Sequence, residues 1–193
     1  MRFTAVLLLL LSACASPQSQ PVAGEASAPP RLSGDAFYAA DGVKLPLKSW
    51  LPKGKPRAVI LALHGFNDYS HAFEDTGAFF KQRGVAVYTY DQRGFGAAPM
   101  TGIWADERNL TGDLRECVLR LKARHPGVPL YILGESMGGA VAMVALSDAS
   151  FPPVDGVILS APAVWGGMGM NPFFHLPLST LAQTLPDRTF TGE

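Results

Sequence analysis

The residue best placed to do covalent chemistry is Ser136, in the stretch PLYILGESMGGAVAMVAL that spans residues 129–146. Residues 130–133 form an apolar run typical of a buried strand, whereas residues 137–146 are rich in Ala, Met and Leu and favour a helix. Between them the serine stands in the pattern G-x-S-x-G, whose glycines keep side chains away from a strained strand-to-helix turn. The helix would also direct its first amides at the serine. The sequence therefore predicts a nucleophile rather than a structural serine.

A serine hydroxyl needs a neighbouring base, which is usually a histidine that a carboxylate orients. The histidines of the chain are His64, His71, His125 and His175. His71 opens an expected helix and His125 ends one, so both are interpreted as surface residues. His175 lies in an apolar stretch and is not favoured as the base. The residues around the serine thus leave its base unassigned.

Composition limits the kind of protein this can be. With 193 residues, 48% of them hydrophobic, the chain can bury one sizeable core but is too short for two ordinary domains and a leader. The formal net charge is zero and the basic residues are scattered among acidic ones, which argues against a nucleic-acid partner. No cluster of Cys and His has metal-ligand spacing, so neither a metal nor a cofactor is expected.

The N-terminus has the features of a bacterial export signal. A short basic start precedes an apolar run over residues 5–11, which is too short to span a bilayer as a helix. The sequence Leu-Ser-Ala-Cys that follows ends at Cys14 and resembles the bacterial lipobox, whose cysteine is lipidated and becomes the first residue of the mature protein. Ordinary secretory cleavage nearby is the alternative. We therefore expect a signal peptide over residues 1–14 and an exported, lipid-anchored protein of the bacterial cell envelope.

Residues 15–36 are expected to form a disordered linker. They are rich in Pro, Ser, Ala and Gln and carry almost nothing to bury. Behind a lipidated cysteine, such a segment would hold a globular domain a short distance from a membrane surface. The globular domain is expected to begin at residue 37, and Cys117 is expected in its core.

Strand and helix signals alternate along the rest of the chain. Apolar runs typical of strands cover residues 43–51, 58–63, 85–90, 130–133 and 156–160. Helical spacing of apolar residues, or helix start and stop signals, occur over residues 71–83, 110–121 and 137–146. This alternation predicts an α/β fold with a mostly parallel, doubly wound sheet covered by helices on both faces. Ligands of such sheets bind beyond the carboxyl ends of the strands, where His64, Asp91 and Ser136 all fall.

The motifs HGF, DQRGFG and GESMGG, in this order, resemble those of the α/β-hydrolase superfamily, and specifically of its monoglyceride lipase and lysophospholipase group, which are serine aminopeptidase-type hydrolases. The resemblance implies that Ser136 is the nucleophile and that the backbone amides of Phe66 and Met137 form the oxyanion hole. It also implies a structural role for His64 and an organising role for Asp91 in the DQRGFG loop. The implied activity is hydrolysis of lipid-like carboxylic esters through an acyl-enzyme. The alternatives are an aminopeptidase- or thioesterase-type hydrolase and a catalytically dead binding or scaffold protein.

In this fold the acid and the base of the triad follow the serine along the chain. The resemblance places both after a helical cap, so they are expected beyond Glu193. The chain is then either a fragment of a longer enzyme, which we favour, or a truncated gene product, and it is expected to be inactive by itself. Residues 37–163 would then be the N-terminal part of the hydrolase core, and residues 164–193 the start of the cap. Apolar side chains of this last stretch, which include Met168, Phe173 and Phe174, are expected either to line an acyl-chain channel or to pack the cap onto the sheet.

Overall fold

Strands form where the chain concentrates apolar and β-branched residues. The computed structural model describes residues 19–24, 26–164, 180 and 184. The strands of this part of the chain are β1 (Arg31–Ser33), β2 (Ala36–Tyr38), β3 (Lys44–Trp50), β4 (Ala58–Leu63), β5 (Val85–Tyr90), β6 (Leu130–Glu135) and β7 (Gly156–Ser160). They hydrogen bond into one sheet in the order β1-β2-β3-β5-β4-β6-β7.

Helices fill the connections between the central strands. A 3-10 turn, Ser70–Phe73, leads into α1 (Glu74–Lys81), and α2 (Glu107–Arg124) and α3 (Met137–Ser147) follow. The carboxylate of Asp106 caps α2 by accepting the amide of Arg108 at 2.9 Å. None of the helices in the described ranges is long and apolar enough to cross a membrane.

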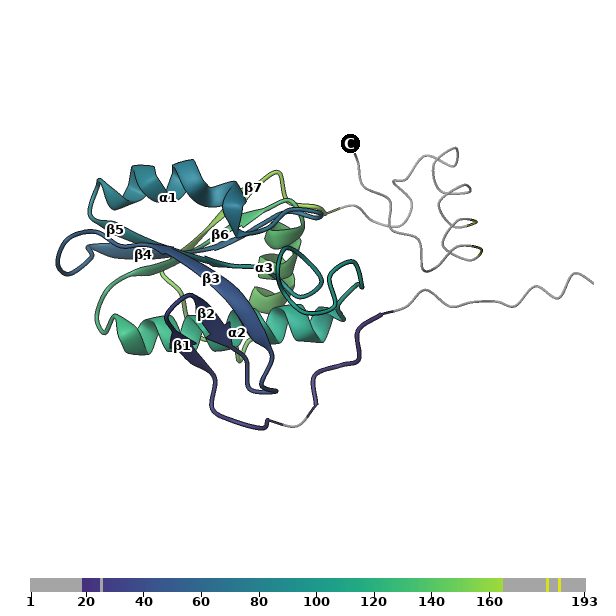
Figure 1. The fold of residues 1–193 in the computed structure, drawn as a ribbon. Helices are drawn as coiled ribbons and strands as arrows, with labels where there is room; N and C mark the ends of the chain where they lie inside the picture. Colours follow the sequence, from purple (N-terminus) through teal and green to yellow (C-terminus); the bar gives the residue numbers. More distant parts are fainter. Residues whose placement is uncertain (1–18, 25, 165–179, 181–183, 185–193) are drawn as a thin grey trace, which may run out of the picture. The chain divides into compact units, whose positions relative to one another are not determined.

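The sheet is parallel where helices connect its strands. β4 pairs in parallel with β5 and with β6, and β6 pairs in parallel with β7, whereas β1, β2 and β3 are joined to their neighbours as antiparallel strands. Figure 1 shows α1 on one face of the sheet, with α2 and α3 on the other. The prediction of a mostly parallel, doubly wound α/β sheet is confirmed.

Two apolar cores lie on the two faces of the sheet. The larger core joins buried side chains of β4, β5 and β6 to those of α2 and α3, and it includes Cys117, as the sequence predicted. The smaller core lies under α1 and is built around Ile60, Val87 and Phe73. Burial on both faces explains why the central strands read as continuous apolar runs rather than as alternating ones.

The structure differs from the expected disordered linker over residues 19–36. This segment contains β1 and the start of β2, which pair as an antiparallel hairpin in which Leu32 faces Phe37. Gln20, further toward the N-terminus, is also buried. The low apolar content predicted disorder, but the backbone amides and carbonyls of this segment find partners on the folded domain.

The register of the parallel strands brings the expected site residues to one edge of the sheet. Leu63 of β4 stands beside Gly134 of β6, and Glu135 stands beside Ser160 of β7. The residues that follow these strands therefore emerge at the same level. Among them are His64 after β4, Asp91 after β5 and Ser136 after β6, which confirms their predicted place at the carboxyl ends.

Candidate active site

Ser136 lies in the tight turn between β6 and α3, with φ 48° and ψ −113°. A positive φ is costly for a residue with a side chain and persists only where the surroundings enforce it. Here the amide of Ser136 donates to Ser160 at 2.9 Å, and its carbonyl accepts from Ala140 at 3.1 Å and from Ala163 at 2.9 Å. The turn is thus held between β7 and the first turn of α3. Its half-buried side chain has no hydrogen-bond partner within the described ranges.

The glycines on both sides of the serine permit close packing of backbones. A Cβ atom at Gly134 would lie 2.6 Å from the Cα of Gly139, and one at Gly138 would lie 2.7 Å from the Cβ of Leu63 and still closer to its carbonyl. Real Cβ atoms are not found at such distances. The motif therefore lets the start of α3 pack directly against β6 and against the end of β4.

Replacing Gly138 with alanine should lower both the stability and the activity of the full-length protein. The added methyl group would push α3 away from the end of β4, at a cost of about 1–3 kcal/mol, and would displace Ser136. Gly112→Ala is the matched control, since a Cβ at Gly112 in α2 meets nothing within 4 Å and should stabilise the helix by about 0.5–1 kcal/mol. Urea unfolding measures the change in stability of each variant. Equal stability of the two variants would contradict the packing argument.

The loop after β4 lies next to the serine. A Cβ atom at Gly65 would lie 3.4 Å from the Cβ of Ser136 and 3.9 Å from its Oγ. The amide of Phe66, which follows, and the amide of Met137, which begins α3, donate to no acceptor in the described part of the chain. Two amide donors without a protein acceptor, in the residues adjoining Ser136 and Gly65, are what an oxyanion would need. The geometry is compatible with the predicted roles of Phe66 and Met137.

His64 is not available to serve as the base of Ser136. Its ring is buried, its Nε2 accepts the amide of Gln92 at 2.9 Å, and its Nδ1 lies 2.8 Å from the carbonyl of Gly65. The side chain of Gln92 also donates to the carbonyl of His64 at 2.8 Å. Burial lowers the pKa of His64, which favours the neutral ring that these contacts require. His64 thus fastens the loop after β4 to the loop after β5.

The carboxylate of Asp91 organises the DQRGFG loop, as the resemblance implied. It accepts the amide of Ser70 at 2.9 Å through one oxygen and the amide of Ala97 at 2.9 Å through the other. Both oxygens are therefore engaged in supporting turns, and Asp91 has a structural function. At the opposite end of the sheet, the carboxylate of Asp155 accepts the amide of Leu130 at 2.8 Å.

A buried ion network beneath this loop was not recognised from the sequence. Arg93 donates two hydrogen bonds to Asp113, both of 2.7 Å, and two to Asp41, of 2.6 and 3.1 Å. Burial acts to lower the pKa of Arg93, but the hydrogen bonds and charges of the two aspartates hold it above its ordinary value. The signal that could have indicated this network is Asp113, a charged residue on the apolar stripe of α2 between Leu110 and Leu114.

Aromatic rings pack together on the loops that follow β4 and β5. The Phe66 ring, 66% exposed, lies 5.5 Å from the ring of Phe95 and 6.1 Å from that of Trp104. The Phe95 ring in turn contacts the ring of His64 at 5.6 Å. These contacts bring the loops after β4 and β5 together with the segment before α2.

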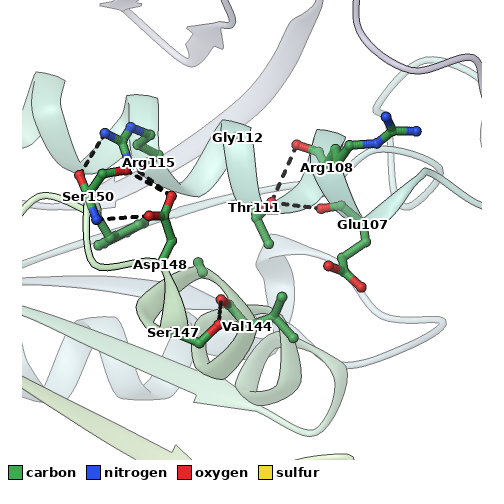
Figure 2. Close-up of a pocket in the computed structure, with 11 residues that line it drawn as sticks. Glu107, Arg108, Thr111, Gly112, Arg115, Val144, Ser147, Asp148 and Ser150 are labelled. Carbon is green, nitrogen blue, oxygen red and sulfur yellow. Dashed lines mark hydrogen bonds and ion pairs between the residues drawn. The ribbon is translucent and has the colours of Figure 1, made fainter.

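One groove of the described surface lies away from these residues. It has a volume of about 480 Å3 and runs between α2 and the end of α3. Figure 2 shows that its polar groups bind one another, with Arg115 bonded to Ser150 and paired with Asp148. The groove contains none of the predicted site residues, so it is not a candidate for the catalytic pocket.

Several predicted site residues lie outside the described part of the chain. These are Cys14, Met168, Phe173 and Phe174, and His175, which was not favoured as the base, also lies outside it. Within the described ranges, no group of three or more His, Cys, Asp or Glu side chains could hold a metal ion.

Comparison with known proteins gives a consistent set of relatives. The sequence matches the family described as serine aminopeptidase, S33, over residues 54–193. It is 28% identical over 169 residues to the monoglyceride lipase of Rattus norvegicus, covering 83% of this chain and 54% of that protein. It is also 28% identical over 156 residues to the monoacylglycerol lipase of Mycolicibacterium smegmatis, covering 80% and 55%. The chain thus spans about half the length of these curated relatives.

A solved structure supports the same fold. The crystal structure of a soluble variant of monoglyceride lipase from Saccharomyces cerevisiae, in complex with a substrate analog, is similar with a TM-score of 0.66 and 24% identity, covering 90% of this chain and 59% of that one. This likeness concerns the arrangement of strands and helices, whereas the family match extends over most of the sequence. The chain therefore belongs to the serine aminopeptidase S33 family of α/β hydrolases.

Proposed function

We propose that the full-length protein is a serine hydrolase that cleaves carboxylic esters of lipid-like alcohols, such as monoacylglycerols or lysophospholipids. The observation that carries the proposal is the strained turn at Ser136, which lies beside Gly65 and is followed by the free amide of Met137. The names of the relatives, which are monoglyceride and monoacylglycerol lipases, support a lipid ester as substrate.

In the proposed reaction, Ser136 Oγ forms a bond to the ester carbonyl carbon while its proton passes to a base. The carbonyl oxygen becomes an oxyanion that the amides of Phe66 and Met137 stabilise, by roughly 3 kcal/mol each. The tetrahedral intermediate then breaks its bond to the alcohol oxygen, which leaves with the proton, and water later releases the acyl group by the same steps. Within the described ranges no side chain is hydrogen bonded to Ser136 Oγ, and His64 is engaged by Gln92 and Gly65, so the proposed base lies outside the described residues.

A substrate panel tests this proposal on the full-length protein. Monoacylglycerols and p-nitrophenyl esters should be turned over at least about 100-fold faster than aminoacyl p-nitroanilides or acyl thioesters. A site built for esters should bind the transition state of ester cleavage more tightly than those of the other substrates. A preference for the anilide would favour the aminopeptidase alternative, and a preference for the thioester would favour a thioesterase. No turnover of any of them would favour a binding protein.

We also propose that Cys14 carries a lipid that tethers the protein to the bacterial cell envelope. The support is the Leu-Ser-Ala-Cys sequence after the apolar run. Cys14→Ser should shift the protein from the membrane fraction to the soluble fraction, since lipidation needs the thiol. Cys117→Ser is the matched control. The Cys117 thiol is buried in the core, so its replacement should leave the distribution between the membrane and soluble fractions unchanged. Membrane association that survives Cys14→Ser, without a lipid mass on the wild type, would refute the anchor.

A further inference from the structure

Residues 19–24, here called the N-terminal strap, lie against a loop that borders the candidate site. The main-chain amide of Gln20 donates to the carbonyl of Trp104 at 2.7 Å, and Ser19 forms an isolated parallel bridge with Trp104. The side-chain amide of Gln20 donates to the carbonyl of Ile103 at 2.8 Å. Gln20 is only 3% exposed. Because polar side chains are buried to this degree when they are hydrogen bonded, Gln20 is a specific attachment of the strap.

A second attachment lies at the start of α2. The side chain of Asn109 accepts the amide of Ala23 at 2.6 Å and donates to the carbonyl of Pro21 at 2.8 Å. Asn109 is itself buried. Its side-chain amide supplies hydrogen-bond partners to the strap backbone, as a neighbouring strand would. The strap is therefore held at two points by buried polar side chains, one on the strap and one on the domain.

The strap also touches the DQRGFG loop. The side-chain nitrogen of Gln20 lies 3.1 Å from the place where a Cβ atom on Gly94 would stand. Gly94 accepts the amide of Gly102 at 2.8 Å, and the amide of Ile103 closes a turn onto Met100 at 3.0 Å. Gln20 thus packs into the junction of the DQRGFG loop with the turn that leads to Trp104.

Trp104 links this junction to the oxyanion loop. Its ring lies 6.4 Å from the ring of Phe95 and 6.1 Å from the ring of Phe66, and those two rings lie 5.5 Å apart. The amide of Phe66 is one of the two candidate oxyanion donors. A shift of the Trp104 backbone would therefore be transmitted through packed rings to a group whose position matters to a fraction of an ångström.

We propose that the N-terminal strap is a positioning element of the catalytic site, in which Gln20 fixes Trp104 and thereby the Phe66 amide. The catalytic consequence rests on the proposed hydrolase function, whereas the attachment of the strap does not. Gln20 is a positioning residue, because it acts through Trp104 rather than on the substrate.

Two substitutions at Gln20 in the full-length protein test the proposal. Gln20→Met keeps the length of the side chain and removes its hydrogen bonds, and Gln20→Ala removes the packing as well. Both should lower kcat for p-nitrophenyl butyrate by about tenfold and change KM by less than about twofold, because a displaced oxyanion donor affects the transition state more than substrate binding. Val22→Ala is the control within the strap, since that side chain is exposed. Wild-type kcat in both Gln20 variants would overturn the proposal.

Hydrogen exchange measured by NMR gives a readout that does not depend on hydrolysis. The amides of Gln20 and Ala23 should be protected in the wild type and in Ser136→Ala, and the amides of Gly102 and Ile103 should exchange at least about tenfold faster in Gln20→Ala. Unchanged exchange of Gly102 and Ile103 would overturn the proposal. If the wild type hydrolyses no ester, the proposed function fails by itself, and the exchange result alone decides whether the strap holds the loop.

Discussion

Replacing Ser136 with alanine in the full-length protein should reduce kcat for monoacylglycerol hydrolysis by roughly 10⁶-fold, the loss expected when a serine nucleophile is removed. The residual rate should remain about a thousandfold above that of water, because the free amides of Phe66 and Met137 would still stabilise the oxyanion. KM should change little. The measurement is a comparison of kcat and KM for the two proteins at equal folded concentration.

Ser147→Ala is the matched control for this experiment. Ser147 lies at the other end of α3, where its hydroxyl donates to the carbonyl of Val144 at 2.7 Å, so its removal should leave kcat unchanged. A third variant, Ser136→Gly, should be as inactive as Ser136→Ala but more stable by about 1 kcal/mol, since glycine relieves the positive φ of the turn. Retention of more than a few per cent of activity in Ser136→Ala would exclude Ser136 as the nucleophile.

Replacing Arg93 with methionine should lower the free energy of unfolding by about 3–5 kcal/mol, because it leaves the buried carboxylate of Asp113 and the partly buried carboxylate of Asp41 without their cation. The side chains of Arg93 and Asp113 are 5% and 3% exposed, so water cannot replace the lost partner. The effect can be read from urea unfolding of the full-length protein near pH 7, which lies above the pKa of about 6 to which burial raises Asp113.

Two further variants separate loss of the network from loss of one charge. The double variant Arg93→Met with Asp113→Leu should recover part of the stability, since an apolar replacement of a buried ion pair is often neutral or stabilising. Arg115→Met should have little effect, because Arg115 pairs with Asp148 at 3.7 Å on the exposed surface. If Arg93→Met and Arg115→Met prove equally stable, the buried network makes no particular contribution to the fold.

Much of the site follows from local patterns that can be recognised in the sequence. The turn at Ser136 lies between a strand and a helix, as predicted, because residues 130–133 and 137–146 have the apolar content that those elements need. The positions of Gly134 and Gly138 are also local, since a strained turn with closely packed backbones excludes a Cβ atom. Periodicity further indicated which strands are buried on both faces, and hence the parallel, doubly wound sheet.

The sequence alone determined the strands and helices of the parallel part of the sheet and where the serine stands, because apolar periodicity and glycine spacing act over a few residues. Only the tertiary structure decided what holds the loops around it, including the antiparallel β1 and β2 hairpin, the engagement of His64 by Gln92, and the attachment of the strap by Gln20. Gln20 is 83 residues from its partner Ile103, and His64 is 28 residues from Gln92. Such contacts are single polar pairs that do not repeat, so no pattern along the chain predicts them. They form because a buried donor or acceptor needs a partner once the sheet has brought the distant loops together.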